Sequence, residues 1–422
     1  MDEIIAYLIR FLVGEDCARR VAYTADASTF RLYDLVIIPS GFFDNGRYAA
    51  ERSMPSLPLR QWEGIPILYG HPTMQTDGGS ILLYADLIAG AFFLLSRYEE
   101  MMRRDLRDRH GRFPGKESLP YRAGFIHRPI IDEYRTALRR LLGKSYTGGG
   151  FGSIVLTHDI DAPYLYRSPK GFVRSMLAGR GLRTSLNGLF GPPEADPYYT
   201  FPQMQAMSSR LSDMSANVCC RLFFRAGGRT AFDKPHYDPA CRDLRRIAAI
   251  FAAAKGFEAG LHASYEAGLK PSLIASEKIR LEKALGCSIA CNRHHFLAAR
   301  EPEDMHSLIN AGLTHDYTMG YADMAGFRLG TARCVRWIAP DVRQLTDLTL
   351  HPLLIMDSTL EEQKYMGLTF EAASASCRML IDNAHRVGGD VCLLWHNTSM
   401  VYGTGSYLRR LYTDLLSYIR EK

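Results

Sequence analysis

The sequence predicts an α/β protein in which a parallel sheet, open or closed into a barrel, follows a smaller N-terminal α/β domain. Two observations give this fold class. The chain has 422 residues, more than one ordinary compact core holds, so two domains are expected. From Ser153 onward, short apolar segments alternate with helical patterns, and repeated β-then-α units of this kind form parallel sheets.

The first predicted domain covers residues 1–148 and has no assigned role. A helix is expected at its start, in MDEIIAYLIRFLV, and short buried strands at Tyr33–Ser40 and Ile65–Gly70. Residues 81–104 are predicted to form one buried helix, because their apolar part is too short to span a bilayer. The charged run that follows, 96–114, is expected mainly to be the solvated end of that helix and a loop, with contact to an anionic substrate as the alternative.

The second predicted domain covers residues 149–422 and begins within a glycine cluster, KSYTGGGFG. Its strands are expected at SIVLTHD, VCCRLFF, FEAGLH and VCLLWH, and helical patterns such as PSLIASEKIRLEKALG lie between them. A basic insertion at about 167–200 interrupts the alternation. Up to Gly191 it has no acidic residue and five basic ones: Arg167, Lys170, Arg174, Arg180 and Arg183. It is either a solvated loop or a contact for an anionic or lipid-linked substrate or a membrane surface.

Composition excludes several classes of protein. The net charge of +6 is modest and spread along the chain, which gives no case for a nucleic-acid partner. The nine cysteines are odd in number and contain no CxxC pair; Cys219–Cys220 and Cys287/Cys291 are expected to be small buried thiols, which points to a reducing compartment. Asp2 and Glu3 stand where a signal peptide carries basic residues, so a cytoplasmic location is expected.

Two carboxylates, Asp159 and Asp161, directly follow the first apolar strand of the second domain. At a strand end both can turn into a cleft, where one can hold a metal and the other can take a proton from water. Spacing alone also suits a helix cap or a turn.

Histidines follow later strands in the same way. His262 ends FEAGLH, His294 and His295 stand beside Arg293 in CNRHHFLAAR, and His396 ends VCLLWH. Each alone also suits a structural histidine. Because the carboxyl ends of parallel strands share one edge, ligand and catalytic groups are expected there.

In this order, the two aspartates, the histidines and the arginine resemble the polysaccharide deacetylase superfamily over about residues 153–420. The resemblance implies a distorted α/β barrel that holds a divalent metal through one aspartate and two histidines. The family's opening motif is commonly TFDDG and here reads THDID, as in a branch with T-H-D-[VI]-D. By that match Asp159 is the catalytic base, Asp161 is the aspartate ligand, and His396 is the general acid that protonates the leaving amine.

The second family motif departs from the pattern. It is H-[ST]-x-x-H, and here it reads HASYE, so His262 carries over and the second histidine is missing. Glu266 or His295 could complete the ligand set. We favour His295, because the branch reads R-x-H-[FY]-L at this point, and Arg293 then takes the place of the arginine that orients the base.

Further matches indicate three other charged residues. HDYTMGYADMAGFRLGT resembles D-[YF]-[ST]-M-G-Y and G-F-R-x-G-T of the branch, which places Asp316 and Arg328 on charged positions. Asp316 is expected to pair with Arg293 or Arg328, because buried charge needs pairing. MDSTL places Asp357 near the same rim. FFLLSRYEE and RDRHGRF also resemble the domain that precedes the barrel in this branch.

The resemblance implies a metal-dependent hydrolase that removes an N-acetyl group from an amino-sugar substrate, either a carbohydrate or a lipid-linked sugar. Zinc is the first expected metal, with nickel, cobalt or iron as alternatives. Two other functions stay open: an allantoinase-like hydrolase of a small amide, and an inactive barrel that binds a glycan or a protein. An aspartyl-phosphate phosphatase fits poorly, because Pro163 stands where its motif has threonine or valine. The sequence does not predict the oligomeric state.

Overall fold

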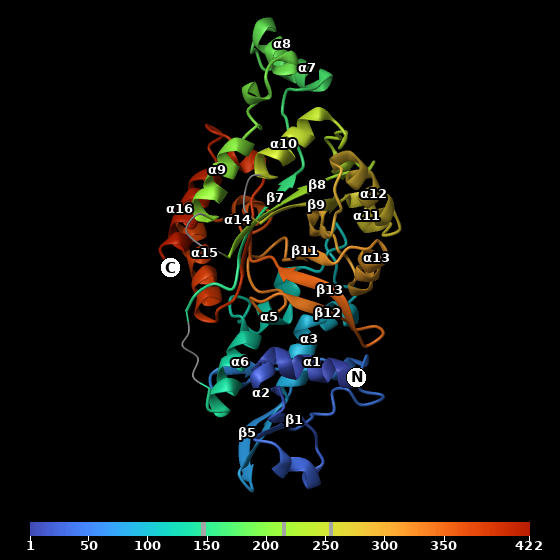
Figure 1. The fold of residues 1–422 in the computed structure, drawn as a ribbon, viewed down its shortest axis with the longest axis vertical. Coiled ribbons are helices and arrows are strands. Elements are labelled where there is room, and N and C mark those ends of the chain that lie inside the picture. Colours follow the sequence, from blue (N-terminus) through green and yellow to red (C-terminus); the bar gives the residue numbers. More distant parts are fainter. Residues whose placement is uncertain (145–148, 213–216, 253–255) are drawn as a thin grey trace.

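The computed structural model describes residues 1–144, 149–212, 217–252 and 256–422. Two larger sheets follow one another along the long axis of the molecule, with helices around them (Figure 1). The predicted domain boundary between 148 and 149 adjoins residues 145–148, which lie outside the described residues, so it stays a prediction.

The smaller sheet belongs to the N-terminal part of the chain. Its strand order is β1-β2-β6-β5, with the first three strands parallel and β5 antiparallel to β6. This part also contains a separate hairpin, β3-β4, and several helices, among which α1 and α6 pack against each other. The bounds are α1 (Asp2–Val13), β1 (Val21–Tyr23), β2 (Leu35–Ile37), β3 (Arg60–Trp62), β4 (Ile65–Ile67), β5 (Gly70–Asp77), β6 (Ser80–Ala85) and α6 (Ile130–Leu141).

The single helix predicted over residues 81–104 is wrong at its start. Residues 81–85 belong to β6, and α3 (Leu87–Leu95) begins only after Asp86, whose side chain accepts a hydrogen bond from the Ala89 N–H at 2.9 Å. A buried apolar run does not distinguish strand from helix by periodicity, and the N-cap aspartate is the local signal that does. After α3 the chain bends at Arg97 into α4 (Tyr98–Met102). No helix of the described residues is both long and apolar enough to cross a membrane.

Among the described residues, nine strands form the larger sheet in the order β12-β13-β11-β10-β9-β8-β7-β15-β14. All neighbours are parallel except β12 and β13. The four strands predicted from the sequence are confirmed as β7, β8, β9 and β15. The bounds are β7 (Ile154–Ile160), β8 (Val218–Phe224), β9 (Phe257–Ala263), β10 (Cys291–His294), β11 (His315–Met319), β12 (Val335–Ala339), β13 (Gln344–Pro352), β14 (Ile355–Met356) and β15 (Val391–Leu394).

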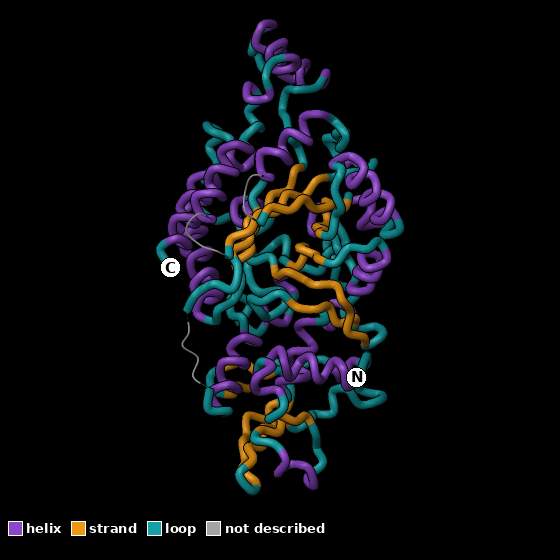
Figure 2. Tube along the Cα trace, in the orientation of Figure 1, coloured by secondary structure: helices purple, strands orange, loops and turns teal. Residues whose placement is uncertain are grey.

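The strand pairing does not close the barrel that the resemblance implies. The described strands form an open sheet with β12 and β14 at its edges, although it curves strongly (Figure 2). Leu353 and Leu354 alone separate β13 from β14. The Leu353 N–H donates to the Met319 carbonyl in β11 at 3.0 Å, and the Leu354 N–H donates to the Cys392 carbonyl in β15 at 3.1 Å. One extended segment therefore joins β11 and β15, which lie near opposite edges of the sheet.

Helices flank the larger sheet on its outer side (Figure 1). The helical pattern PSLIASEKIRLEKALG is confirmed as α12, and one apolar core packs between helices and strands. The bounds are α9 (Phe201–Ser212), α10 (Arg242–Ala252), α11 (Tyr265–Leu269), α12 (Leu273–Leu285), α13 (Met305–Asn310), α14 (Asp357–Glu361), α15 (Phe370–Arg386) and α16 (Leu408–Arg420).

The basic insertion folds into a helical hairpin. It consists of α7 (Pro169–Leu177) and α8 (Leu182–Phe190), which follow β7 and project at the end of the molecule opposite the N-terminal sheet (Figure 1). Gly179 and Gly181, with φ of 71° and 77°, form the turn between the helices. Such left-handed backbone favours glycine.

Candidate metal centre

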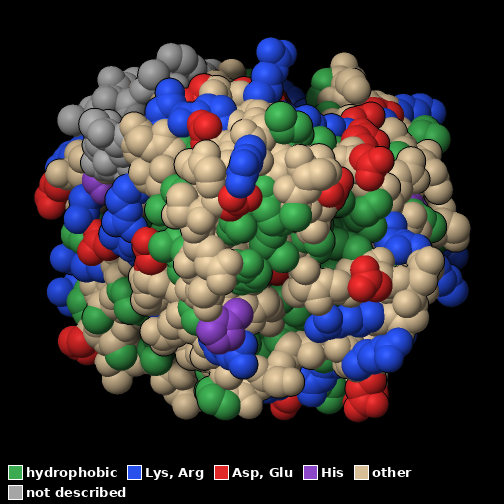
Figure 3. Space-filling model, turned by 90° about the horizontal axis from the view of Figure 1, so that it is seen from below, with side chains coloured by type: hydrophobic (Ala, Val, Ile, Leu, Met, Phe, Trp, Pro, Cys, Tyr) green, Lys and Arg blue, Asp and Glu red, His purple; other side chains and the backbone are tan. Residues whose placement is uncertain are grey.

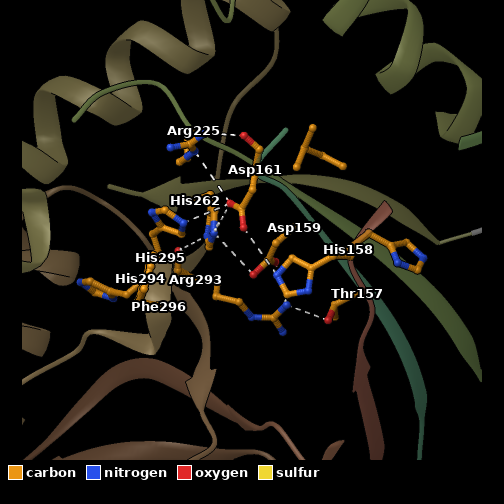
Figure 4. Close-up of polar contacts among 12 residues, drawn as sticks. Thr157, His158, Asp159, Asp161, Arg225, His262, Arg293, His294, His295 and Phe296 are labelled. Atoms are coloured by element: carbon orange, nitrogen blue, oxygen red, sulfur yellow. Dashed lines mark hydrogen bonds and ion pairs between the residues drawn. The ribbon is translucent and has the colours of Figure 1, made fainter. Parts of the chain in front are cut away.

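The C-terminal ends of four parallel strands bring five predicted site residues together, and Figure 4 shows four of them, Asp159, Asp161, His262 and His295. They belong to one edge of the sheet, where successive parallel strands end and the following loops begin. These residues are Asp159 near the end of β7, Asp161 just after it, His262 in β9, His295 after β10 and His396 after β15.

Asp161, His262 and His295 form the centre of this cluster. Oδ1 of Asp161 lies 3.3 Å from Nε2 of His262 and 3.3 Å from Nε2 of His295. One ligand atom of each residue lies within 4.8 Å of the others. A carboxylate and two imidazoles are a typical protein ligand set for zinc and similar divalent metals.

The hydrogen bonds of His262 test whether the residues fit a metal. Its Nδ1 lies 2.9 Å from the Arg293 carbonyl, which can only accept, so Nδ1 carries a proton. Its Nε2 is buried, forms no hydrogen bond within the described residues, and faces an equally unpartnered Oδ1 of Asp161. Two buried acceptors face each other favourably only when a cation or a proton lies between them. The residues therefore fit a divalent metal, whose histidine ligands commonly donate their other N–H to a carbonyl or carboxylate.

A buried carboxylate lies beside the other ring nitrogen of His295. Its Nδ1 is 3.5 Å from Oδ1 of Asp233, an ion-pair distance without a hydrogen bond, and this oxygen accepts from the Tyr265 N–H at 2.7 Å. Burial alone would raise the pKa of Asp233, but His295 and the Thr230 hydroxyl outweigh it and lower the pKa to about 2. Asp233 was not predicted, because its only local signal is a capping box with Thr230.

In the metal-free chain, opposite charges in the cluster stabilise the ionised forms of Asp161 and His295. Burial alone would raise the pKa of Asp161, but His295 and His262 hold that pKa well below its usual range. Burial alone would lower the pKa of His295, and Asp161 outweighs it and raises the pKa. Arg225, which the sequence did not indicate, has its Nε 3.8 Å from Oδ1 of Asp161 and donates to the carbonyls of Asp161 and Asp233.

The loop that carries His295 has a strained backbone held by the N-terminal part of the chain. Phe296 and Leu297 have φ of 61° and 53°, a left-handed conformation that non-glycine residues rarely adopt. The Phe296 carbonyl accepts a hydrogen bond from Nη1 of Arg112 at 2.8 Å. Asp108 orients Arg112 through Nε and Nη2, at 2.8 and 2.7 Å.

The position of Arg112 corrects the expectation for residues 96–114. Arg97, Glu99, Glu100 and Arg112 are all buried, so this charged run is not mainly solvated. Its arginines and carboxylates pair with one another and with later parts of the chain, which a charge pattern alone does not reveal.

Arg293 holds the second carboxylate, Asp159. Its fully buried guanidinium donates from Nη1 to Oδ1 of Asp159 at 3.0 Å and to the Thr157 hydroxyl at 2.7 Å (Figure 4). Oδ2 of Asp159 stays directed at the cluster, 3.5 Å from Nε2 of His262. Asp159 therefore has one oxygen fixed by a cation and one available for chemistry.

His396 lies against the cluster with a buried carboxylate behind it. Its Nδ1 lies 2.8 Å from Oδ1 of Asp357, and its backbone N–H donates to Oδ2 of Asp357 at 2.7 Å. Its Nε2 lies 3.6 Å from Oδ2 of Asp161. Burial alone would lower the pKa of His396, but Asp357 and Asp161 outweigh it and raise the pKa to about 10. In the metal-free chain the imidazole is therefore protonated at neutral pH.

Asp316 and Arg328 lie outside the cluster, and their predicted pairing is wrong. Asp316 accepts from Nδ2 of Asn292 at 2.8 Å and forms no ion pair with Arg293 or Arg328 among the described residues. Arg328 instead pairs with Glu100 at 2.8 Å. Asp316 therefore supports β10 and β11, and Arg328 joins the N-terminal part of the chain to the rest.

Glu266 and His294 also point elsewhere. The Glu266 carboxylate accepts from the Arg229 N–H at 2.9 Å and does not belong to the metal-binding group. His294 is buried on the other side of its strand, with Nδ1 at 3.1 Å from Nδ2 of Asn292, and burial lowers its pKa. Of the two predicted candidates for the third ligand, the structure brings His295 to Asp161.

A cavity of about 360 Å³ opens over the cluster. Asp159, Asp161, His262, His295 and His396 line its floor, and other walls include Arg112, Glu361, Glu362, Lys364 and Tyr365. The volume is within the usual range of small-molecule sites. Arg112 means that the N-terminal part of the chain contributes to this cavity.

Comparisons with known proteins add little to this geometry. A model for a family of unknown function (DUF7033) matches residues 3–147. None of the curated protein sequences compared with the chain matches it. A solved structure described as a "putative polysaccharide deacetylase from Mycobacterium smegmatis" matches with a TM-score of 0.38 and 16% identity, covering 66% of this chain and 92% of that chain. A TM-score this low carries no argument, so the function rests on the site.

Proposed function

We propose that the chain is a metal-dependent hydrolase that removes an N-acetyl group from an amino-sugar substrate. One observation carries the proposal. The group of Asp161, His262 and His295 lies between a carboxylate with one free oxygen, Asp159, and a protonated imidazole, His396. Amide hydrolysis needs such a base and such an acid on either side of the reacting carbon.

The base is Asp159. A divalent metal held by Asp161, His262 and His295, with zinc first and nickel, cobalt or iron as alternatives, would supply an acidified water and a polarised carbonyl. Arg293 occupies Oδ1 of Asp159, so the proton of the attacking water goes to Oδ2. Arg293 thus fixes the direction of proton transfer without touching the substrate.

The acid is His396. Asp357 keeps its imidazole protonated and oriented through Nδ1, which leaves the Nε2 proton directed into the cavity. As the C–N bond breaks, this proton goes to the leaving nitrogen, which otherwise departs as an unstable amide anion. The buried Asp357 stabilises the charge on the imidazole before transfer.

The cavity walls suit the hydroxyl groups of an amino sugar. Arg112 pairs with Asp108 at 2.7 Å and Lys364 pairs with Glu362 at 2.6 Å, so these walls have mixed charge, and Glu361 and Glu362 can accept hydrogen bonds from sugar hydroxyls. An amino sugar linked to a nucleotide or a lipid has such hydroxyls. Because the cavity is only about 360 Å³, an allantoinase-like hydrolysis of a small amide is the second candidate.

Metal content and acetate release test the proposal. The purified protein is expected to hold close to one divalent metal ion per chain, measured by elemental mass spectrometry. His295→Ala should remove most of it, whereas the matched control Glu266→Ala should retain it, because Glu266 lies outside the group. Asp159→Asn should slow acetate release from nucleotide-linked N-acetylglucosamine by about 100-fold or more while metal stays bound.

Three results would contradict the proposed activity, its substrate class or its metal ligands. If the purified protein holds no metal and His295→Ala changes neither metal content nor acetate release, the chain would instead be a binding protein. Bound metal with hydrolysis only of small amides would favour the second candidate. Equal loss of metal in the Glu266→Ala control would show that the ligand set is wrong.

A further inference from the structure

The α7–α8 hairpin exposes large apolar side chains. On each helix they are spaced by three or four residues, so they share one face. Single exposed apolar residues are ordinary, whereas a group within so short a segment forms a patch. Its members, 40% to 85% exposed, are Val173, Met176, Leu177, Leu182, Leu186 and Phe190.

The inner side of the hairpin is built from small residues instead. The Ser185 hydroxyl donates to the Ser175 hydroxyl at 2.8 Å, and both residues are buried. At Gly171 a Cβ atom would lie only 2.7 Å from the backbone of Tyr166. A hairpin suited to water alone turns its leucines inward. Here the apolar face is outside, so it requires another apolar medium.

Cations flank this apolar face. Lys170, Arg174 and Arg183 are exposed, and none forms an ion pair with a described residue. No acidic residue occurs from Arg167 to Gly191. The opposite end of the molecule differs, because basic and acidic side chains are mixed there (Figure 3). An apolar face bordered by basic residues is typical of helices that lie at the surface of an anionic membrane.

The base of the hairpin is fixed to the metal centre. The Asn397 side chain donates to the carbonyls of Ala162 and Tyr198, at 3.0 and 2.9 Å, and so ties the start and end of the insertion together. Asn397 follows His396, and Ala162 follows Asp161. The hairpin therefore projects from the edge of the sheet that carries the site.

We propose that the α7–α8 hairpin docks on the surface of an anionic lipid bilayer, with its apolar face among the acyl chains and its cations at the level of the phosphates. Each helix has nine residues, which is too short to span a bilayer. A second copy of the chain would bring the same cations to the same face, and like charges oppose such docking. This inference is independent of the proposed hydrolysis.

Sedimentation of the full chain with vesicles tests the proposal. We expect binding to phosphatidylcholine vesicles that contain about 30% phosphatidylglycerol, and none to phosphatidylcholine alone. K170E/R174E/R183E should weaken binding by about 100-fold or more, because each cation near the surface contributes about fivefold. L177S/F190S should weaken it by at least about tenfold, since Leu177 and Phe190 are the most exposed apolar residues of the hairpin.

Matched controls separate the hairpin from the general charge of the protein. R19E/K283E/R420E makes the same change in net charge at exposed positions elsewhere, and I279S/V342S removes apolar side chains that are 65% and 56% exposed outside the hairpin. Both should bind vesicles like the unchanged chain. In L177W, the fluorescence emission should shift to shorter wavelength with anionic vesicles, while the three natural tryptophans are buried.

Other outcomes overturn the proposal. L177S/F190S that binds as tightly as the unchanged chain would show that the apolar face does not insert. If R19E/K283E/R420E binds anionic vesicles as weakly as K170E/R174E/R183E does, the attraction is a non-specific effect of the net charge of the protein. If the unchanged chain is dimeric and L177S/F190S is monomeric, with no vesicle binding by either, the face is an interface between copies. None of these vesicle-binding outcomes bears on the metal content and acetate release that test the proposed hydrolysis.

Discussion

Nε2 of His262 and Oδ1 of Asp161 face each other at 3.3 Å, and neither forms a hydrogen bond within the described residues. Each is oriented from behind, His262 through the Arg293 carbonyl and Asp161 through Arg225. These two acceptors repel each other unless a cation or a proton lies between them. Such preorganisation is expected of a metal site and has no advantage for a simple core.

Metal binding is expected to release a proton from His295. Asp161 raises the pKa of His295 in the metal-free chain, so this imidazole is protonated to a higher pH than usual and must lose its proton to become a ligand. Calorimetric titration with zinc in two buffers of different ionisation enthalpy should show this release, and affinity should fall as pH falls. His295→Ala should bind weakly and release fewer protons. Affinity that is independent of pH would contradict the ligand role.

Arg112 is expected to control the position of His295. Arg112→Ala removes the donor that holds the Phe296 carbonyl, in a loop where two residues adopt left-handed backbone. Each such residue costs of order 1–3 kcal/mol, so the loop should relax and metal affinity should fall by about 10- to 100-fold. Arg109→Ala, in the same segment but exposed, is the matched control. Equal affinity of both variants would show that Arg112 only lines the cavity.

Much of the site could be predicted because its residues lie at strand ends that the sequence marks clearly. Asp159, Asp161 and His262 directly follow or end apolar runs, and the geometry of a parallel sheet brings such ends together. Arg112 and Asp233 could not be found in this way. They reach the site through loops, and no periodic pattern connects position 112 with the loop after β10.

The fold shows the same division. Alternating strands and helices predicted the parallel sheet, but not how its ends are arranged, because the two hydrogen bonds of Leu353 and Leu354 depend on curvature that no local pattern encodes. Asp316 and Arg328 were placed by charge alone, and burial supplied other partners, Asn292 and Glu100. A buried charged side chain needs a polar or oppositely charged partner, but the sequence alone does not identify which residue that partner is.

The buried pair of Glu100 and Arg328 is expected to make the protein less stable in acid. Burial alone would raise the pKa of Glu100, but Arg328 and Arg97 outweigh it and lower the pKa from 4.5 to about 2. Its contribution is therefore complete above pH 4.5 and is lost as pH falls through 2. Glu100→Gln should lower the free energy of unfolding by about 3–5 kcal/mol at neutral pH, because it leaves two buried arginines without their carboxylate. Chemical denaturation from neutral pH to pH 3 should show that the difference narrows in acid. A constant difference would exclude the carboxylate as the cause.

Asp357 is expected to set the alkaline limit of activity and part of the alkaline stability. It is the main cause of the raised pKa of His396, about 10 against an ordinary 6.5. A raised pKa in the folded state stabilises the protein fully below pH 6.5, and this contribution is lost as pH rises through 10. Asp357→Asn removes the negative charge and keeps an acceptor for Nδ1, so the alkaline limb of kcat/KM should move toward neutral pH. Bound metal should be unchanged, because Asp357 lies outside the ligand group. An unshifted limb, measured on the same substrate for both proteins, would mean that another group supplies the proton to the leaving nitrogen.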